Sequence, residues 1–196
     1  MPTTGGGDLL LTDAVRNRDV EAVIRRLGQT TFDSAAEDTC RAFGMAAAWG
    51  LAEVVQLLLD AGVSPNCHDE HGVTALMLAA RAGQPHMAKL LVQRGADLEA
   101  RDELGQTPLF YAVQGGSVEL AAVLLELGAD PLVRDRKGRS PLYYAKRRPL
   151  INFNIPDWVP LIGGIYVFGL TYRIRRRSHM IEILDNAGRM RSEGRA

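Results

Sequence analysis

The chain of 196 residues contains only two cysteines, Cys40 and Cys67, and this scarcity excludes a disulfide framework. A chain of this length can build its own hydrophobic core, so we expect both thiols to be reduced. The N-terminal stretch MPTTGGGDLLL lacks the basic segment and the apolar run of a secretory signal. The sequence therefore predicts a cytoplasmic protein.

Long apolar runs are also missing. One mostly apolar segment of thirteen uncharged residues, between Asp157 and Thr171, lies within DWVPLIGGIYVFGLTYRIRRR, residues 157–177. A transmembrane helix needs about 20 consecutive apolar residues. Asp157, Pro160 and the Gly163–Gly164 pair interrupt this stretch, and Pro156 directly precedes it. The sequence therefore does not predict a membrane span.

The chain lacks catalytic motifs as well. It has no Gly-x-Gly-x-x-Gly, no P-loop and no Gly-x-Ser-x-Gly. The best metal-like cluster is CHDEH, which supplies Cys67, His68 and His71. A tetrahedral site needs further ligands, and neither His86 nor His179 has a suitable spacing. We expect no enzyme activity, no metal and no other cofactor.

The net charge is zero, but the charges are unevenly distributed. Residues 1–133 hold 9 Lys+Arg and 18 Asp+Glu, whereas residues 134–196 hold 14 and 5. Either both sets lie on solvated faces, or the basic end meets an acidic protein, nucleic acid or an anionic membrane. The basic runs come without a reading helix or a base-stacking motif, so nucleic acid is not expected. Electrostatic steering towards an acidic protein fits better.

The sequence does contain a period of 33 residues, seen in Gly72, Gly105 and Gly138. Three further series share this spacing: Asp69, Asp102 and Asp135; Gly50, Gly83 and Gly116; and Gly62, Gly95 and Gly128. Four series with one period indicate an internal structural repeat.

Each unit has the pattern of a turn followed by two helices. Thr107–Pro108 and Ser140–Pro141 each supply a capping side chain and a proline at the first helical position. The first helix is rich in alanine, so neighbouring helices can approach closely. Gly83 and Gly116 are expected to end it as left-handed caps. The second helix carries apolar pairs such as Leu124–Leu125 at core spacing.

This pattern resembles the ankyrin repeat, a β-turn followed by two helices with a Thr-Pro-Leu-His-type start. Residues 69–101 and 102–134 match it nearly throughout, and residues 36–68 match it more loosely. Residues 8–35 are expected to form an N-terminal capping helical pair, and residues 135–196 the last repeat. The family's histidine is replaced by Met77, Phe110 and Tyr143. The resemblance implies one all-α solenoid domain over residues 1–196.

The last repeat carries an insertion. The 33-residue period places the end of its second helix at position 161, but the matching segment SHMIEILDNAG ends at Gly188, 27 residues later. We therefore expect an insertion over about 149–174, between the two helices. The β-branched and aromatic run IYVFGLTY predicts a short strand, with Gly163–Gly164 as its turn, folded over the end of the solenoid as a cap.

The insertion also offers a contact surface. Trp158, Tyr166 and Phe168 would dock a partner if its tip is exposed. Alternatively, with Ile165 they would lie at a membrane interface, and Arg173–Arg177 would meet anionic headgroups. Capping and docking can coexist.

The ankyrin resemblance further implies a concave binding surface formed by the turn tips and the solvent face of each inner helix. Trp49 lies late in the first inner helix, where it is either a binding hot spot or packed against the 28–38 loop. The other matching positions are His68, Glu70, His71, Val73, Arg81, Arg101, Glu103, Leu104, Gln106, Gln114, Arg134, Arg136, Lys137, Arg139, Arg147 and Arg148.

The sequence thus predicts a monomeric, non-catalytic protein-binding module, an adaptor or an inhibitor. Two alternatives stay open. One is an immunity- or antitoxin-type protein that blocks the active site of an enzyme with the inserted loop. The other is a peripheral membrane scaffold that uses the apolar insertion and Arg173–Arg177.

Overall fold

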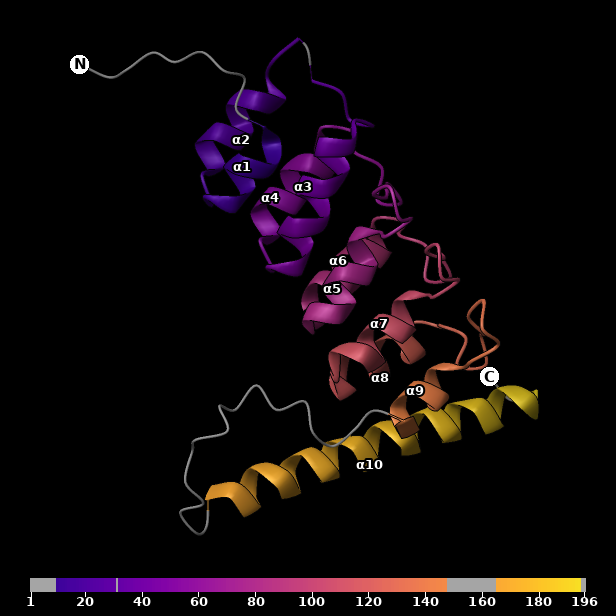
Figure 1. The fold of residues 1–196 in the computed structure, drawn as a ribbon. Helices are drawn as coiled ribbons and strands as arrows, with labels where there is room; N and C mark the ends of the chain where they lie inside the picture. Colours follow the sequence, from indigo (N-terminus) through magenta and orange to yellow (C-terminus); the bar gives the residue numbers. More distant parts are fainter. Residues whose placement is uncertain (1–9, 31, 148–164, 195–196) are drawn as a thin grey trace.

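The helices of the protein follow one another as helix–turn–helix pairs along a single stack (Figure 1). The computed structural model describes residues 10–30, 32–147 and 165–194, and for residues 165–176 the backbone alone. Within these ranges the helices are α1 (Leu11–Arg16), α2 (Val20–Leu27), α3 (Glu37–Ala48), α4 (Ala52–Asp60), α5 (Ala75–Ala82), α6 (Pro85–Gln93), α7 (Pro108–Gly115), α8 (Val118–Glu126), α9 (Pro141–Arg147) and α10 (Ile165–Ser192). The predicted all-α solenoid is confirmed.

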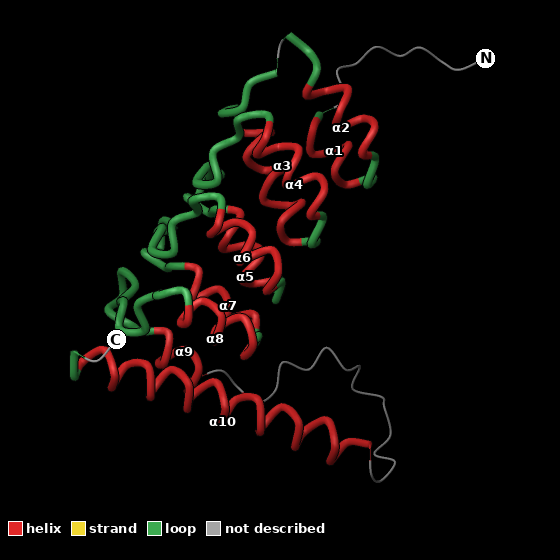
Figure 2. Tube along the Cα trace, turned by 180° about the vertical axis from the view of Figure 1, so that it is seen from behind, coloured by secondary structure: helices red, strands yellow, loops and turns green. Residues whose placement is uncertain are grey.

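Inner and outer helices alternate along the stack. The inner helices α1, α3, α5, α7 and α9 pack each against the next, and each outer helix packs against the inner helix of its own pair. The turn tips project along one edge of the stack (Figure 2). Within the described ranges there is no strand, and the only β-type pairing is one antiparallel bridge between His68 and Thr74.

The inner helices approach closely because their facing positions carry alanine and glycine. Ala79 and Ala80 of α5 and Ala112 of α7 are 0% exposed. A Cβ atom at Gly115 would lie only 2.3 Å from the carbonyl oxygen of Arg81. The backbone of α7 therefore passes α5 with no room for a side chain at this point.

The predicted helix boundaries are largely confirmed. Gly83 and Gly116 end α5 and α7 in the left-handed conformation, with φ of 71° and 76°. Ser140 caps α9, since the Tyr143 N–H donates to its hydroxyl at 3.3 Å. The prediction for Thr107 is wrong, because its side chain makes no capping hydrogen bond.

The place of the family histidine is partly filled by a sulfur atom. The Met77 N–H donates to Thr74 Oγ1 at 3.4 Å, and the Thr74 N–H points back to Met77 Sδ at 3.5 Å. This reciprocal pair closes the start of α5 although a thioether is a weak acceptor.

The N-terminal helical pair is present as α1 and α2. It is tied to the next repeat by Asp38 of α3, whose carboxylate accepts the Leu11 N–H and the Thr12 hydroxyl, both at 2.7 Å. The first bond satisfies a backbone N–H at the start of α1. The N-cap residue of α1, Leu10, has no side chain that could accept it.

The expected strand over IYVFGLTY is wrong, because these residues form the first two turns of α10. β-propensity reflects packing within a sheet, and the described residues contain no sheet edge with which a strand could pair. A helix instead satisfies each backbone N–H and C=O locally. Gly188 does not end the helix, which runs on to Ser192.

Part of the predicted 149–174 insertion is therefore helical. Residues 165–174 belong to α10, and residues 148–164, including the Gly163–Gly164 turn, lie outside the described residues.

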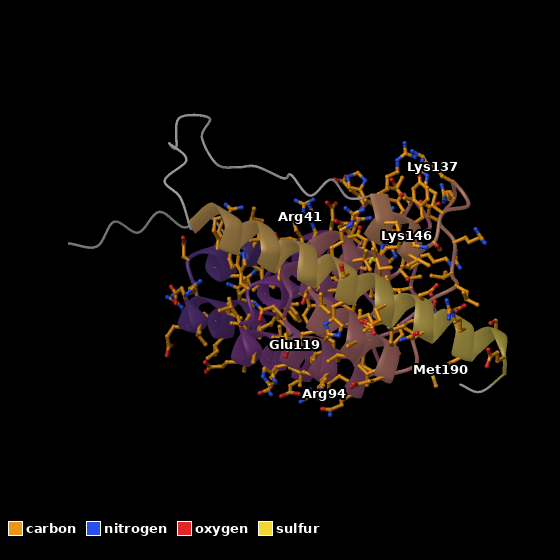
Figure 3. All side chains as sticks on the ribbon, turned by 90° about the horizontal axis from the view of Figure 1, so that it is seen from below. Arg41, Arg94, Glu119, Lys137, Lys146 and Met190 are labelled. Carbon is orange, nitrogen blue, oxygen red and sulfur yellow. The ribbon has the colours of Figure 1, made fainter. Side chains whose placement is uncertain are left out.

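The C-terminal half of α10 covers the last described repeat (Figure 3). Met180, Leu184 and Gly188 are buried at four-residue spacing, which places them on one helical face against α8 and α9. Arg177 donates to the carbonyl oxygen of Lys146. A helix thus supplies the cover that the sequence assigned to a hairpin.

Among the described residues, none of the helices has the length and apolar content that crossing a bilayer requires.

Two glycines test the close approach of the inner helices. In an open helix, alanine would be favoured over glycine by about 1 kcal/mol. Gly115→Ala places a methyl group against a fixed backbone oxygen, so we expect a loss of roughly 1–3 kcal/mol in the free energy of unfolding. Gly44→Ala is the matched variant, because its methyl group would meet only Leu78 Cδ1, at 2.7 Å, which can rotate away.

Urea unfolding followed by circular dichroism measures both variants. The result expected is a clearly larger loss for Gly115→Ala than for Gly44→Ala. Equal stability of the two variants would contradict the contact between α7 and α5.

Candidate partner-binding surface

An aspartate closes each of three turn tips, at residues 69–73, 102–106 and 135–139. Asp102 Oδ1 accepts the backbone N–H groups of Leu104 at 2.8 Å and Gln106 at 2.7 Å. The Asp102 N–H in turn donates to the carbonyl oxygen of Gln106 at 3.1 Å. Asp69 and Asp135 close their own tips with the same pattern. Because these bonds lie within the tip, the backbone holds its shape without a partner.

Two of the tips are braced by a tyrosine. The Tyr111 hydroxyl donates to Asp102 Oδ2 at 2.9 Å, and the Tyr144 hydroxyl donates to Asp135 Oδ2 at 2.7 Å. Burial, and then the neighbouring carboxylate, raise the pKa of both phenols above its usual range. The equivalent position in the first tip is Leu78, so the brace is specific to the later repeats.

Neighbouring tips are joined by backbone hydrogen bonds. The Glu103 N–H donates to the carbonyl oxygen of His71 at 3.0 Å, and the Arg136 N–H donates to that of Leu104 at 2.9 Å. The three tips therefore form a connected row along one edge of the stack (Figure 2). We call this row, together with the exposed residues of α3, α5, α7 and α9, the candidate surface.

The structure brings most of the predicted tip residues together on this row. His71 lies between two carboxylates, with Nδ1 3.4 Å from Glu103 Oε2 and Nε2 3.8 Å from Glu70 Oε1. Val73 and Arg139 are partly exposed, and the following are exposed: His68, Glu70, His71, Arg101, Glu103, Leu104, Arg134, Arg136 and Lys137.

The predicted inner-helix residues lie at one register. Arg81 of α5 and Arg147 of α9 are exposed, and Gln114 of α7 is half-buried. Trp49 follows the last residue of α3, one position later than the equivalent of Arg81, which is Ala48. Trp49 is 42% exposed as a whole residue.

Gln106 lies elsewhere than expected. It was predicted on the open surface but is only 5% exposed. Its Oε1 accepts a hydrogen bond from Gln114 Nε2 at 2.9 Å, and its Nε2 lies 3.4 Å from the Tyr144 hydroxyl. Gln106 therefore supports Gln114 through a hydrogen bond and is largely shielded from solvent.

The remaining predicted contacts cannot be placed on this surface. Arg148 and Trp158 lie outside the described residues, and Tyr166 and Phe168 lie in the part of α10 where only the backbone is described.

Sequence reasoning missed Tyr143 as a surface residue. Its ring lies between Arg139 and Arg147, with their Cζ atoms 5.5 Å and 5.6 Å from the ring centroid. The four-residue spacing from Tyr143 to Arg147 within α9 was the available signal, because such residues share a helical face. Arg139 precedes α9 and reaches the ring from the tip, which this spacing does not predict.

The described residues hold no group of three or more His, Cys, Asp or Glu side chains that suits a metal ion. Cys40 is buried and Cys67 is partly buried, and both are free thiols. Burial, followed by the neighbouring Cys40 side chain, raises the pKa of Cys67. A thiol with a raised pKa stays protonated and is a poor nucleophile. The candidate surface itself presents side chains of mixed charge on a hydrogen-bonded frame.

A family model described as ankyrin repeats (3 copies) matches the chain over residues 11–102, 43–135 and 99–151. A search among curated proteins finds no match to the chain.

The Tyr144 brace gives a pH-dependent prediction. Burial would raise the pKa of Asp135, but the N–H groups of Arg139 and Lys137 and the Tyr144 hydroxyl together lower it. The ionised carboxylate therefore adds stability above the usual aspartate pKa, and this stability is lost as pH falls. We expect Tyr144→Phe to cost about 1–2 kcal/mol at neutral pH, and this difference should shrink below about pH 4.

Urea unfolding between neutral and acid pH measures the difference. Tyr143→Phe is the control, because the Tyr143 hydroxyl contacts Arg147 and not a carboxylate. A difference that stays constant down to acid pH would show that the Asp135 carboxylate is not stabilised by Tyr144.

Proposed function

The chain belongs to the ankyrin-repeat family, and we propose that it is an adaptor or inhibitor that binds a protein partner on the candidate surface. Ankyrin repeats are generally protein-interaction modules and are typically non-catalytic. The observation that carries the proposal is the row of tips, whose backbones are bonded internally and to one another while their side chains remain exposed.

A frame of this kind favours binding because little of it has to be ordered when a partner arrives. The cost of association includes the entropy lost when loops and side chains become fixed. Backbone bonds from Glu103 to His71 and from Arg136 to Leu104 have already fixed the tips. The side chains at their apices are thus presented at defined positions.

The charge of the surface changes along the row. The first two tips expose Glu70 and Glu103, whereas the last tip exposes Arg134, Arg136 and Lys137. Complementary charges steer association and fix the register of a partner. The partner proposed here is basic where it meets the first tips and acidic where it meets the last repeat.

Two exposed apolar side chains supply candidate anchors. Trp49 is 42% exposed beside α3, and Leu104 is 55% exposed at the apex of the second tip. Large side chains that a partner buries at the centre of an interface carry most of its binding energy. We propose that both become buried in the complex.

Affinity capture from native cell lysate tests this function. The bait is the full chain, and the surface variant combines Trp49→Ala with Leu104→Ala. The control combines Ile24→Ala with Leu127→Ala. These residues are 46% and 37% exposed, Ile24 in the outer helix α2 and Leu127 directly after the outer helix α8. We expect the control to retain the partner and the surface variant to bind it at least about tenfold more weakly.

Thermal melting verifies that both variants fold. A partner that both variants retain equally would contradict the assignment of the candidate surface. Loss of the partner from the control alone would move the binding site to the outer helices.

A further inference from the structure

Two arginines lie against one tyrosine ring in the last repeat. Arg139 comes from the tip and Arg147 from the end of α9, and their Cζ atoms lie 5.5 Å and 5.6 Å from the centroid of Tyr143. Arg147 also donates to the Tyr143 hydroxyl. We call these three residues the Arg–Tyr–Arg cluster.

The cluster stands on an aromatic base that reaches the core. The ring of Tyr143 packs edge-on against Tyr144, at 5.7 Å between centroids and an interplanar angle of 81°. Tyr144 packs in the same way on Phe110, which is 0% exposed, at 5.7 Å and 82°. Its hydroxyl is held by Asp135. Packing against Tyr144 and Phe110 therefore holds the ring of Tyr143 in a defined position.

Positive charge outnumbers negative charge around the cluster within the described chain. Between positions 134 and 147 the sequence has six cations: Arg134, Arg136, Lys137, Arg139, Lys146 and Arg147. The only acid in this range is Asp135, which is 7% exposed and whose oxygens accept bonds from the tip backbone and Tyr144. Among described residues, none of the six cations forms an ion pair within 4.0 Å.

Arginines in this arrangement suit carboxylate ligands. A guanidinium that lies over an aromatic ring keeps N–H donors along its edge, where they can bind a carboxylate through two parallel bonds. The ring restricts the side chain before binding, so less entropy is lost on binding. Because each Cζ lies within 5.6 Å of one centroid, the two lie no more than about 11 Å apart.

This upper limit accommodates two acidic side chains of an extended peptide. Alternate side chains of an extended chain project from the same side, about 7 Å apart. Two acidic residues separated by one other residue would therefore reach both arginines together. Continuous polyphosphate fits less well, since the adjacent tip exposes Glu103 and Leu104.

We propose that the Arg–Tyr–Arg cluster binds an acidic peptide segment of the partner, with two carboxylates on the guanidinium groups of Arg139 and Arg147. The proposal rests on the proposed protein-binding function and adds the chemistry of the partner at the last repeat. The cluster differs from a general basic patch because it requires the planar guanidinium groups and the tyrosine ring, not positive charge alone.

Fluorescence anisotropy with a labelled peptide tests the cluster directly. The probe is a capped peptide of alternating aspartate and serine, and its comparison is the same peptide with asparagine for aspartate. The test variant combines Arg139→Lys with Arg147→Lys, which keeps the charge and removes both planar groups. The control combines Arg25→Lys with Arg94→Lys, at exposed arginines already beside Asp19 and Asp60.

We expect the aspartate peptide to bind the unchanged protein and the control equally, and the test variant at least about tenfold more weakly. Tyr143→Leu should weaken binding to a similar extent, whereas Tyr143→Phe should stay within about threefold because it retains the ring. The asparagine peptide should not bind. Melting curves establish that each variant is folded.

Three results would overturn the proposal: equal binding of the aspartate peptide to the test variant, equal binding of the asparagine peptide, or no binding of either. Tighter binding of inorganic phosphate, or of vesicles containing phosphatidylserine, with loss in the test variant would assign the cluster to those ligands instead. The proposal for the cluster and the proposed protein-binding function can be refuted independently of each other. The titration needs no natural partner, and the capture variants change Trp49 and Leu104 and leave the cluster intact.

Discussion

The candidate surface depends on one type of interaction, in which the carboxylate of a tip aspartate accepts two backbone N–H groups. Asp69, Asp102 and Asp135 each make it, at distances between 2.7 and 2.9 Å. The carbonyl groups within a short turn do not reach all of its own N–H donors, so the aspartate carboxylate accepts two of them. The shape of every tip then follows from the repeat itself, and its apical side chains are free to vary.

Close packing of the inner helices makes the connection between tips possible. Alanine and glycine on the facing sides of α5 and α7, ending at Gly115 against the Arg81 carbonyl group, bring successive repeats near enough for one tip to bond to the next. Larger side chains on these faces would separate the helices and break the hydrogen bonds between tips. The geometry of the candidate surface therefore depends on the packing of the inner helices.

The last described repeat combines a common frame with distinct chemistry. Its tip has the same aspartate as the others, but the aromatic series Phe110, Tyr144 and Tyr143 extends from the core to the surface beneath two arginines. On its other side α10 buries Met180 and Leu184, which covers apolar surface that the end of a stack would otherwise expose. The repeat thus ends the packed core and carries a strongly basic part of the candidate surface.

The 33-residue period determined the repeat boundaries, the left-handed glycines and the residues of the tips, because each depends on neighbours within one unit. The period did not predict the contacts between repeats. Gln106 is buried and contacts Gln114 and Tyr144, and Tyr144 lies 38 residues away in the sequence. As a polar tip residue, Gln106 could not be told from its exposed neighbours by sequence. IYVFGLTY had strand propensity, but a strand needs a pairing edge, and only the assembled stack shows that the described residues offer none. Local hydrogen bonding and side-chain size follow from the sequence of one repeat. Burial and electrostatic neighbours depend on how successive repeats stack.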